Sequence, residues 1–147
     1  MQKVFLDTNV LLDFVLDRKP FSDYAEKIIA SGLTHKKHLF VSALSLANIA
    51  YIVRKARKNP VSVIQELMTW TDVVNLTKHE FQQALKSGFK DFEDALQFYC
   101  AQHIQTDVIV TRNTRDYSTS SILVQTPLQF LKSLESWKSD YSSALSI

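Results

Sequence analysis

The feature that most constrains the fold of this chain is a set of short runs in which every residue is apolar. The three clearest runs are Val4-Phe5-Leu6, Leu39-Phe40-Val41 and Val108-Ile109-Val110. A strand with one face in water alternates apolar and polar residues, whereas a strand inside a parallel sheet is buried on both faces. The runs therefore predict a parallel sheet whose connecting segments cross over its faces.

The segments between these runs carry apolar residues at helical spacing. Helices are predicted over about residues 10–16, 20–33, 43–57, 60–68, 77–86, 91–104 and 127–134. Two further runs, the largely apolar residues 73–76 and the apolar residues 122–124, predict the remaining strands. Strands that alternate with helices indicate an α/β protein. We therefore expect a three-layer α/β/α sandwich with a central, mainly parallel sheet of four to five strands.

Length and composition suit one domain with a substantial core. The chain has 147 residues, of which 46% are hydrophobic, with only two glycines and three prolines. We expect a single domain over residues 1–134, and a serine-rich tail over residues 135–147 that frays or docks on a partner. The one cysteine, Cys100, excludes an intrachain disulfide framework. No apolar run approaches the roughly 18 residues of a membrane span, so we expect a cytoplasmic protein without membrane contact.

Polar side chains gather where the predicted strands end and where one helix begins. They form three pairs, which are Asp7 with Asn9, Asp91 with Asp94, and Asn113 with Asp116. The first and third pairs follow buried strands, so the carboxyl edge of a parallel sheet brings them together. Helix capping is an alternative role for Asp7 and Asp91. Caps alone, however, do not require acids at every one of these edges.

Carboxylates that are brought together repel one another unless a cation joins them. Oxygen ligands with amide support suit Mg²⁺ or Mn²⁺ better than zinc. A cation of this kind activates a water and neutralises a phosphodiester during cleavage. The sequence contains no glycine-rich phosphate loop, which argues against an ATP-handling protein. The residues themselves therefore predict a site for a hard divalent cation.

Four motifs, in this order, resemble those of the PIN domain family, with the strongest likeness to VapC-type toxins of bacterial type II toxin–antitoxin pairs. The motifs are Phe5-Leu6-Asp7-Thr8-Asn9, Asp91-Phe92-Glu93-Asp94-Ala95-Leu96, Val110-Thr111-Arg112-Asn113 with Asp116-Tyr117, and Val124-Gln125-Thr126-Pro127. The resemblance covers about residues 1–134. It implies a Mg²⁺- or Mn²⁺-dependent endoribonuclease that acts on RNA, forms a homodimer and is inhibited by a cognate antitoxin.

The family's four acids match this sequence at two positions. Asp7 matches the first acid and Asp94 the third, whereas Asn48 stands where the family usually has a glutamate. Asn113 stands where the fourth acid is often found, and Asp116 is the expected substitute. The resemblance implies Asp7, Asp94 and Asp116 as catalytic residues and metal ligands, with Asp91 as a further ligand. The supporting residues are Asn9, Asn48, Thr111 and Asn113.

Basic residues near these motifs are candidates for contacts with RNA phosphates. They are Arg54, Lys55, Arg112 and Arg115. Arg54 and Lys55 end the helix over residues 43–57, where positive charge also stabilises the helix dipole. A solvated helix end is therefore the alternative for these two residues.

Two other functions compete with the nuclease. Asn48 and Asn113 carry no charge and cannot act as a base, which favours a PIN-fold module that binds RNA or a protein without catalysis. A metal-dependent phosphatase of the haloacid dehalogenase type also begins with a strand that ends in aspartate. That family needs a second aspartate two residues later, where this sequence has Asn9.

Overall fold

A computed structural model describes residues 1–34 and 36–134 of the chain, so the predicted tail lies outside the described residues. Its centre is one five-stranded sheet in the order β3-β2-β1-β4-β5. The strands are β1 (Lys3–Leu6), β2 (His38–Ser42), β3 (Asp72–Val74), β4 (Val108–Val110) and β5 (Leu123–Gln125). All four neighbouring pairs are parallel. The sheet confirms the predicted fold class.

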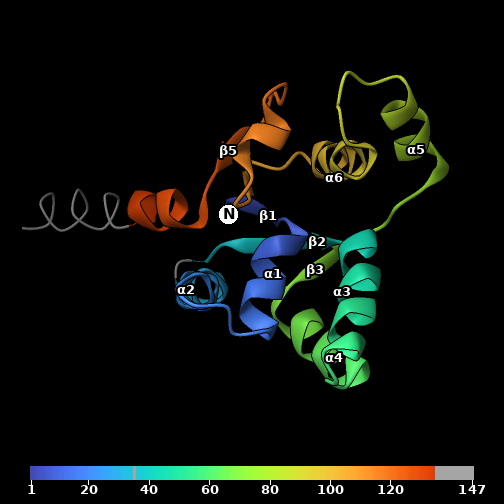
Figure 1. Ribbon diagram of the computed structural model, residues 1–147. Helices are drawn as coiled ribbons and strands as arrows, with labels where there is room; N and C mark the ends of the chain where they lie inside the picture. The colour runs from blue at the N-terminus through green and yellow to red at the C-terminus, as the bar shows by residue number, and fades with distance from the viewer. Residues whose placement is uncertain (35, 135–147) are drawn as a thin grey trace, which may run out of the picture.

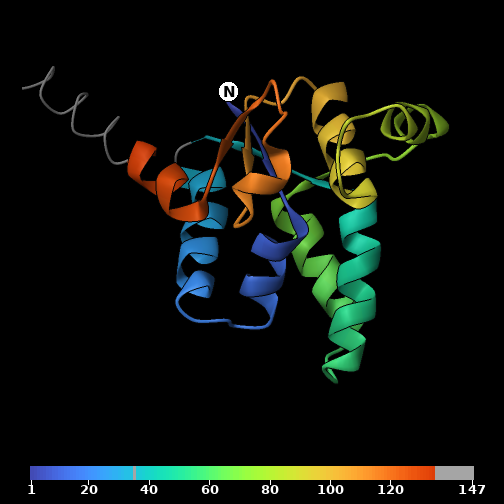
Figure 2. The same cartoon turned by 45° about the horizontal axis from the view of Figure 1, so that its top comes forward.

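Helices connect the strands and cover both faces of the sheet (Figure 1). They are α1 (Thr8–Val15), α2 (Phe21–Thr34), α3 (Ala43–Lys55), α4 (Pro60–Trp70), α5 (Lys78–Leu85) and α6 (Phe92–His103). A short 3-10 helix, η1 (Thr114–Tyr117), follows β4, and residues 127–134 are helical. Helices α1 to α4 lie on one face and α5 and α6 on the other, while α3 and α4 pack side by side (Figure 2).

The core divides along the alternation of the strands, whose successive side chains point to opposite faces. Val4 and Leu6 of β1 pack with α1, α2, α3 and the helix over residues 127–134. Phe5 packs on the other face with Phe98 of α6 and Tyr117 of η1. Burial on both faces is the physical reason that the strands lack polar positions.

Local predictions hold for most elements and fail at α4. The helix predicted from about residue 77 is present as α5, and Thr77 and Glu80 form a capping box at its start. Met68, which the apolar pattern of α4 places inward, is 53% exposed. Leu67 alone is fully buried, because α4 rests mainly on α3 at the edge of the sheet. Among the described residues, no helix combines the length and apolar character needed to cross a membrane.

Candidate active site

A cavity of about 470 Å³ opens beside the carboxyl ends of β1 and β4. Residues from α1, α3, α6 and the loop after β4 line it, and they are Asp7, Thr8, Asn9, Leu12, Asn48, Tyr51, Ile52, Glu93, Asp94, Gln97 and Asn113. The lining brings together five of the residues that the sequence singled out, which are Asp7, Asn9, Asn48, Asp94 and Asn113. The carboxyl edge of the sheet therefore gathers the polar side chains as the strand pattern predicts.

Asp7 directly follows β1, and three donors hold its carboxylate. Oδ1 accepts hydrogen bonds from the Thr8 backbone N–H at 2.8 Å and from the Gln97 amide at 3.2 Å. Oδ2 accepts from the Thr111 hydroxyl at 2.8 Å. The bond from Thr8 caps α1, so the capping alternative is correct as far as it goes. The same carboxylate, only 7% exposed, also faces the cavity in a fixed orientation.

Asn9 and Thr111 brace the loop after β4. The Asn9 amide donates to Thr111 Oγ1 at 3.2 Å, and its Oδ1 accepts from the Arg112 backbone N–H at 3.2 Å. Thr111 Oγ1 also accepts from the Asn113 backbone N–H at 3.1 Å. Through these bonds, Asn9 and Thr111 fix Asp7 and the loop after β4 relative to each other.

Gln97 is a polar hub that the sequence reading did not identify. Its side chain is 3% exposed. Its amide nitrogen lies 2.7 Å from Ser45 Oγ and 3.2 Å from both Thr8 Oγ1 and Asp7 Oδ1. Its carbonyl oxygen accepts from the Ser42 hydroxyl. The available signal for this role was that Gln97 is the one polar residue in the apolar stretch over residues 95–101 of α6.

Asp94 lies on α6 between the main cavity and a second one. Burial, and then the negative charges of four neighbouring acids, raise the pKa of its carboxyl from 3.8 to about 7. Those acids are Asp91, Asp116, Asp7 and Glu93. The predicted acids Asp7, Asp91 and Asp116 therefore all interact electrostatically with Asp94.

The second cavity, of about 280 Å³, separates two of the predicted acids from Asp7. Asp91 and Asp116 line it together with Asp94 and Arg115. Asp91 also caps α6, since its Oδ1 accepts from the Asp94 backbone N–H at 3.0 Å. The sequence predicts one crevice for Asp7, Asp94 and Asp116, whereas the structure divides these acids between two cavities that share Asp94.

Two amides and one unpredicted acid complete the main cavity. Asn113 lines it from the loop after β4, and Asn48 lines it from α3. The Asn48 amide donates a hydrogen bond to Glu93 Oε1. Glu93 belongs to the motif at residues 91–96, but the sequence did not predict its position at the cavity. An acid in the first turn of a helix is already explained by the helix dipole, so the sequence contains no separate sign that Glu93 also lines the cavity.

Tyr117 adds a buried hydroxyl beneath the acids. Its side chain is 2% exposed. Burial raises the pKa of Tyr117 well above its ordinary value, and the charges of Asp7 and Asp94 act in the same direction. The phenol is therefore neutral next to the acidic cluster.

The four basic candidates occupy different surroundings. The Arg112 guanidinium pairs with the buried Asp13 (Nε to Oδ2, 2.7 Å) and stacks on the Phe21 ring, with 4.4 Å to its centroid. Its charge is thus directed into the protein, while Arg115 borders the second cavity. Lys55 Nζ lies 4.6 Å from the ring centre of Tyr51, which lines the main cavity, and Arg54 is exposed nearby on α3.

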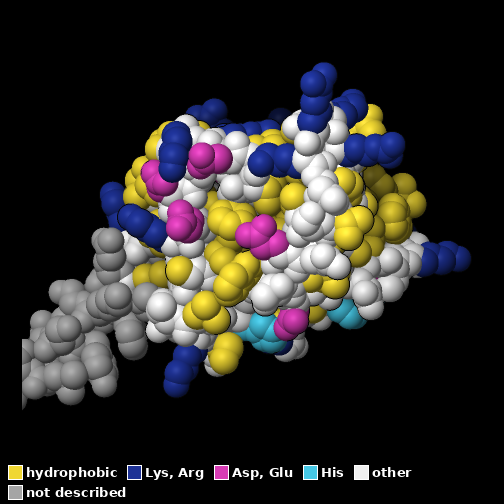
Figure 3. Space-filling view, turned by 90° about the horizontal axis from the view of Figure 1, so that it is seen from below, with side chains coloured by type: hydrophobic (Ala, Val, Ile, Leu, Met, Phe, Trp, Pro, Cys, Tyr) yellow, Lys and Arg dark blue, Asp and Glu magenta, His cyan; other side chains and the backbone are white. Residues whose placement is uncertain are grey.

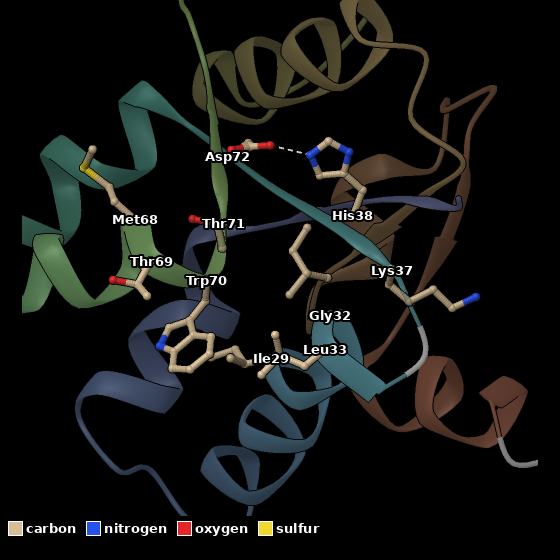
Figure 4. A pocket seen from close by; sticks show the side chains of 11 residues that line it. Ile29, Gly32, Leu33, Lys37, His38, Met68, Thr69, Trp70, Thr71 and Asp72 are labelled. Carbon is tan, nitrogen blue, oxygen red and sulfur yellow. Dashed lines mark hydrogen bonds and ion pairs between the residues drawn. The ribbon is translucent and has the colours of Figure 1, made fainter.

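A further hollow of about 150 Å³ lies at the opposite edge of the sheet, where β2 and β3 begin (Figure 4). Leu33, Met68 and Trp70 contribute apolar surface, and His38 pairs with Asp72 at its rim. None of the acids of the main cavity lines it. It is therefore separate from the candidate active site.

Comparisons with known proteins agree on one family. The family model of the PIN domain matches residues 3–115. Ribonuclease VapC1 of Aquifex aeolicus (strain VF5) is 28% identical over 123 residues, which cover 80% of this chain and 85% of that protein. Residues 3–115 contain β1 to β4, α1 to α6 and every residue of the candidate site except Asp116 and Tyr117.

Solved structures with the same fold come from toxin–antitoxin systems. VapBC2 of Rickettsia felis, bound to a DNA fragment from its promoter, matches with a TM-score of 0.65 and 16% identity over 85% of this chain and 98% of that chain. VapC20 of Mycobacterium tuberculosis, a toxin that cleaves the sarcin-ricin loop, matches with a TM-score of 0.59 and 17% identity over 72% and 86%. At these identities the likeness shows a shared fold.

Proposed function

The chain belongs to the PIN domain family, and we propose that it is a Mg²⁺- or Mn²⁺-dependent endoribonuclease, the toxin of a VapBC-like toxin–antitoxin pair. The observation that carries the proposal is the shared cavity of Asp7 and Asp94 at the carboxyl edge of the sheet. The similarity of the chain to Ribonuclease VapC1 supports RNA as the substrate. Membership of the PIN domain family also argues against the alternative of a phosphatase of the haloacid dehalogenase type.

The donor set of the cavity fits a hydrated divalent cation. Carboxylate and amide oxygens line it, and the acids around Asp94 bring negative charge together. Within residues 1–34 and 36–134, no group of three His, Cys, Asp or Glu side chains is arranged to hold an ion by itself. Mg²⁺ retains several waters and needs only one or two carboxylates from a protein. Asp7 and Asp94 would hold the cation, with Asn48 and Asn113 beside them.

The cation, when bound, supplies charge neutralisation to the phosphodiester and lowers the pKa of a bound water. The chain's own residues prepare this site. Thr8, Thr111 and Gln97 hold Asp7 in one orientation, so its carboxylate needs little reorganisation when a cation binds. Tyr51 is 63% exposed at the cavity rim, where a nucleobase can stack on its ring. The ring also contacts Lys55 Nζ and positions it for a phosphate.

The small net charge of the chain favours single phosphate contacts over a broad basic patch. The net charge is only +2. On the face shown in Figure 3, acidic side chains lie among apolar ones and basic side chains stand mainly toward the margin. We propose Arg54, Lys55 and Arg115 for these contacts, while Arg112 serves chiefly the loop after β4.

The proposed partners follow from the same comparisons. VapBC2 of Rickettsia felis and a complex from Klebsiella pneumoniae are toxin–antitoxin assemblies with this fold. We propose a cognate antitoxin and a homodimer for this chain, in a cytoplasmic setting. Size measurement of the chain alone and co-expressed with the product of a neighbouring small gene tests both partners.

Cleavage of mixed single-stranded RNA tests the activity. We expect cleavage with Mn²⁺ or Mg²⁺, no cleavage with EDTA, and no cleavage by the Asp94→Asn variant. Glu66→Gln is the matched control, since Glu66 is exposed on α4 and lines neither cavity. Calorimetric titration with Mn²⁺ is run on the same samples. Absence of both Mn²⁺ binding and cleavage would sink the proposal.

The second candidate function is a PIN-fold module that binds RNA or protein without catalysis. Two amides, Asn48 and Asn113, at the cavity wall favour it, because they reduce the negative charge of the site. This candidate predicts RNA binding that does not depend on metal and no cleavage at any Mn²⁺ concentration.

A further inference from the structure

Glu93 is a carboxylate at the main cavity with no assigned role. It lies on α6 four positions before Gln97, and residues with this spacing share one helix face. Asp94 lies between them in the sequence, and all three side chains line the cavity. Asp7, which follows β1, lines the same cavity. Glu93 is exposed to solvent. It therefore brings a charged, hydrated oxygen pair to the open side of the site.

Asn48 ties Glu93 to the opposite wall. Its amide, on α3, donates to Glu93 Oε1, so the bond joins two helices across the cavity. The other carboxylate oxygen, Oε2, has no hydrogen-bond or ion-pair partner within residues 1–34 and 36–134. A glutamate on a surface helix ordinarily samples many rotamers. Here the amide restricts the side chain to the cavity and leaves one oxygen free.

We propose that Glu93, held by Asn48, is a further carboxylate of the cation site. The pair places at the cavity the negative charge that α3 itself lacks. The inference rests on the proposed function, since it presupposes a divalent cation at Asp7 and Asp94. Affinity in an oxygen-ligand site rises with the number of charged ligands. Since no three acids of the described residues are arranged to bind one ion directly, Glu93 would contribute through a water, and its charge still adds to the affinity.

The competing explanation is purely local. Glu93 occupies the first turn of α6, where an acid stabilises the positive end of the helix dipole. In that case its bond to Asn48 is a surface contact without consequence for metal. The two explanations differ in whether the removal of the charge changes cation affinity.

Calorimetric titration with Mn²⁺ separates them, without reference to activity. Glu93→Gln keeps an oxygen that accepts from Asn48 and removes only the charge. We expect about ten- to hundredfold weaker Mn²⁺ binding, the range for partners that orient or surround metal ligands. The double variant Asn48→Glu with Glu93→Gln moves the carboxylate to α3 and the amide to α6. We expect it to recover most of the lost affinity, and the control Glu66→Gln to bind as the wild type does.

The outcomes distinguish this inference from the function on which it rests. If the wild type binds Mn²⁺ and Asp94→Asn does not, the cation site stands. If Glu93→Gln then binds as tightly as Glu66→Gln, Glu93 is a helix-end residue and the inference is overturned. If the wild type binds no Mn²⁺, the metal-dependent function itself fails. Melting curves in metal-free buffer verify that every variant is folded.

Discussion

At the scale of single residues, Gln97 fixes the geometry of the site from behind. Its amide reaches Asp7 and Ser45, and its carbonyl accepts from Ser42, so one side chain joins β1, β2, α3 and α6. These three partners are buried, and a buried polar group without its partner costs about 1–3 kcal/mol. Positioning of Asp7 therefore depends on a residue that need not touch the substrate.

We predict that Gln97→Leu weakens Mn²⁺ binding by about ten- to hundredfold and lowers stability by about 1–3 kcal/mol. The control is Gln102→Leu, which makes the same change at an exposed position of the same helix. Calorimetry and urea denaturation measure the two effects. Lower stability with unchanged Mn²⁺ affinity would show that Gln97 serves packing alone.

The sequence revealed some site residues and concealed others for a physical reason. Asp7 and Asp94 stand directly after a strand and at the start of a helix, where the fold type alone brings them to one edge. Gln97 and Glu93 act through hydrogen bonds to residues about 45 to 90 positions away in the chain, which no local pattern encodes. The division between two cavities that share Asp94 depends likewise on the exact path of the loop after β4.

At the scale of elements, an ion pair joins α1 to the loop after β4. Asp13 of α1 is 1% exposed, and both of its oxygens face the Arg112 guanidinium at 2.7 Å and 3.1 Å. Burial raises the pKa of Asp13, while the charges of Arg112 and Arg18 oppose that rise. The loop held in this way carries Asn113 to one cavity and Asp116 to the other.

We predict that Arg112→Leu destabilises the fold by about 3 kcal/mol, because it leaves a buried carboxylate with only the more distant Arg18. The double variant Asp13→Leu with Arg112→Leu should be more stable than Arg112→Leu, since an apolar pair replaces the ion pair. Arg115→Leu, at an exposed position, should stay within about 0.5 kcal/mol of the wild type. Urea denaturation gives all three values, and equal losses for Arg112→Leu and Arg115→Leu would refute the role of the ion pair.

The elements themselves were largely predictable from their apolar patterns. Strands such as β1 and β4 can be recognised in the sequence, because burial on both faces makes nearly all of their residues apolar. The strand after α4 was expected at residues 73–76 but begins at Asp72 and ends at Val74. At the edge of a sheet only one neighbour pairs with a strand, so its limits depend on the register with β2, which the sequence does not contain.

At the scale of the whole molecule, the acidic site and the stability of the fold are coupled through pH. The carboxyl of Asp94 has an ordinary pKa of 3.8 and a folded-state pKa of about 7, owing first to burial and then to the neighbouring acids. Between these values the folded chain holds a proton that the unfolded chain has released. Stability therefore falls as pH rises through this window, and the penalty is complete above it. A bound cation offsets the same repulsion.

We predict that Asp94→Asn is more stable than the wild type in metal-free buffer at pH 8, and that this advantage shrinks as pH falls toward 5. The amide removes the repulsive charge, and near pH 5 the folded wild type is already protonated at Asp94. Saturating Mn²⁺ at pH 8 should raise the melting temperature of the wild type and leave that of Asp94→Asn nearly unchanged. Glu66→Gln, the control, should follow the wild type under every condition. Melting curves of wild type and Asp94→Asn that stay parallel from pH 5 to 8 would mean that Asp94 carries no buried charge, and the electrostatic account of the site would fall with that result.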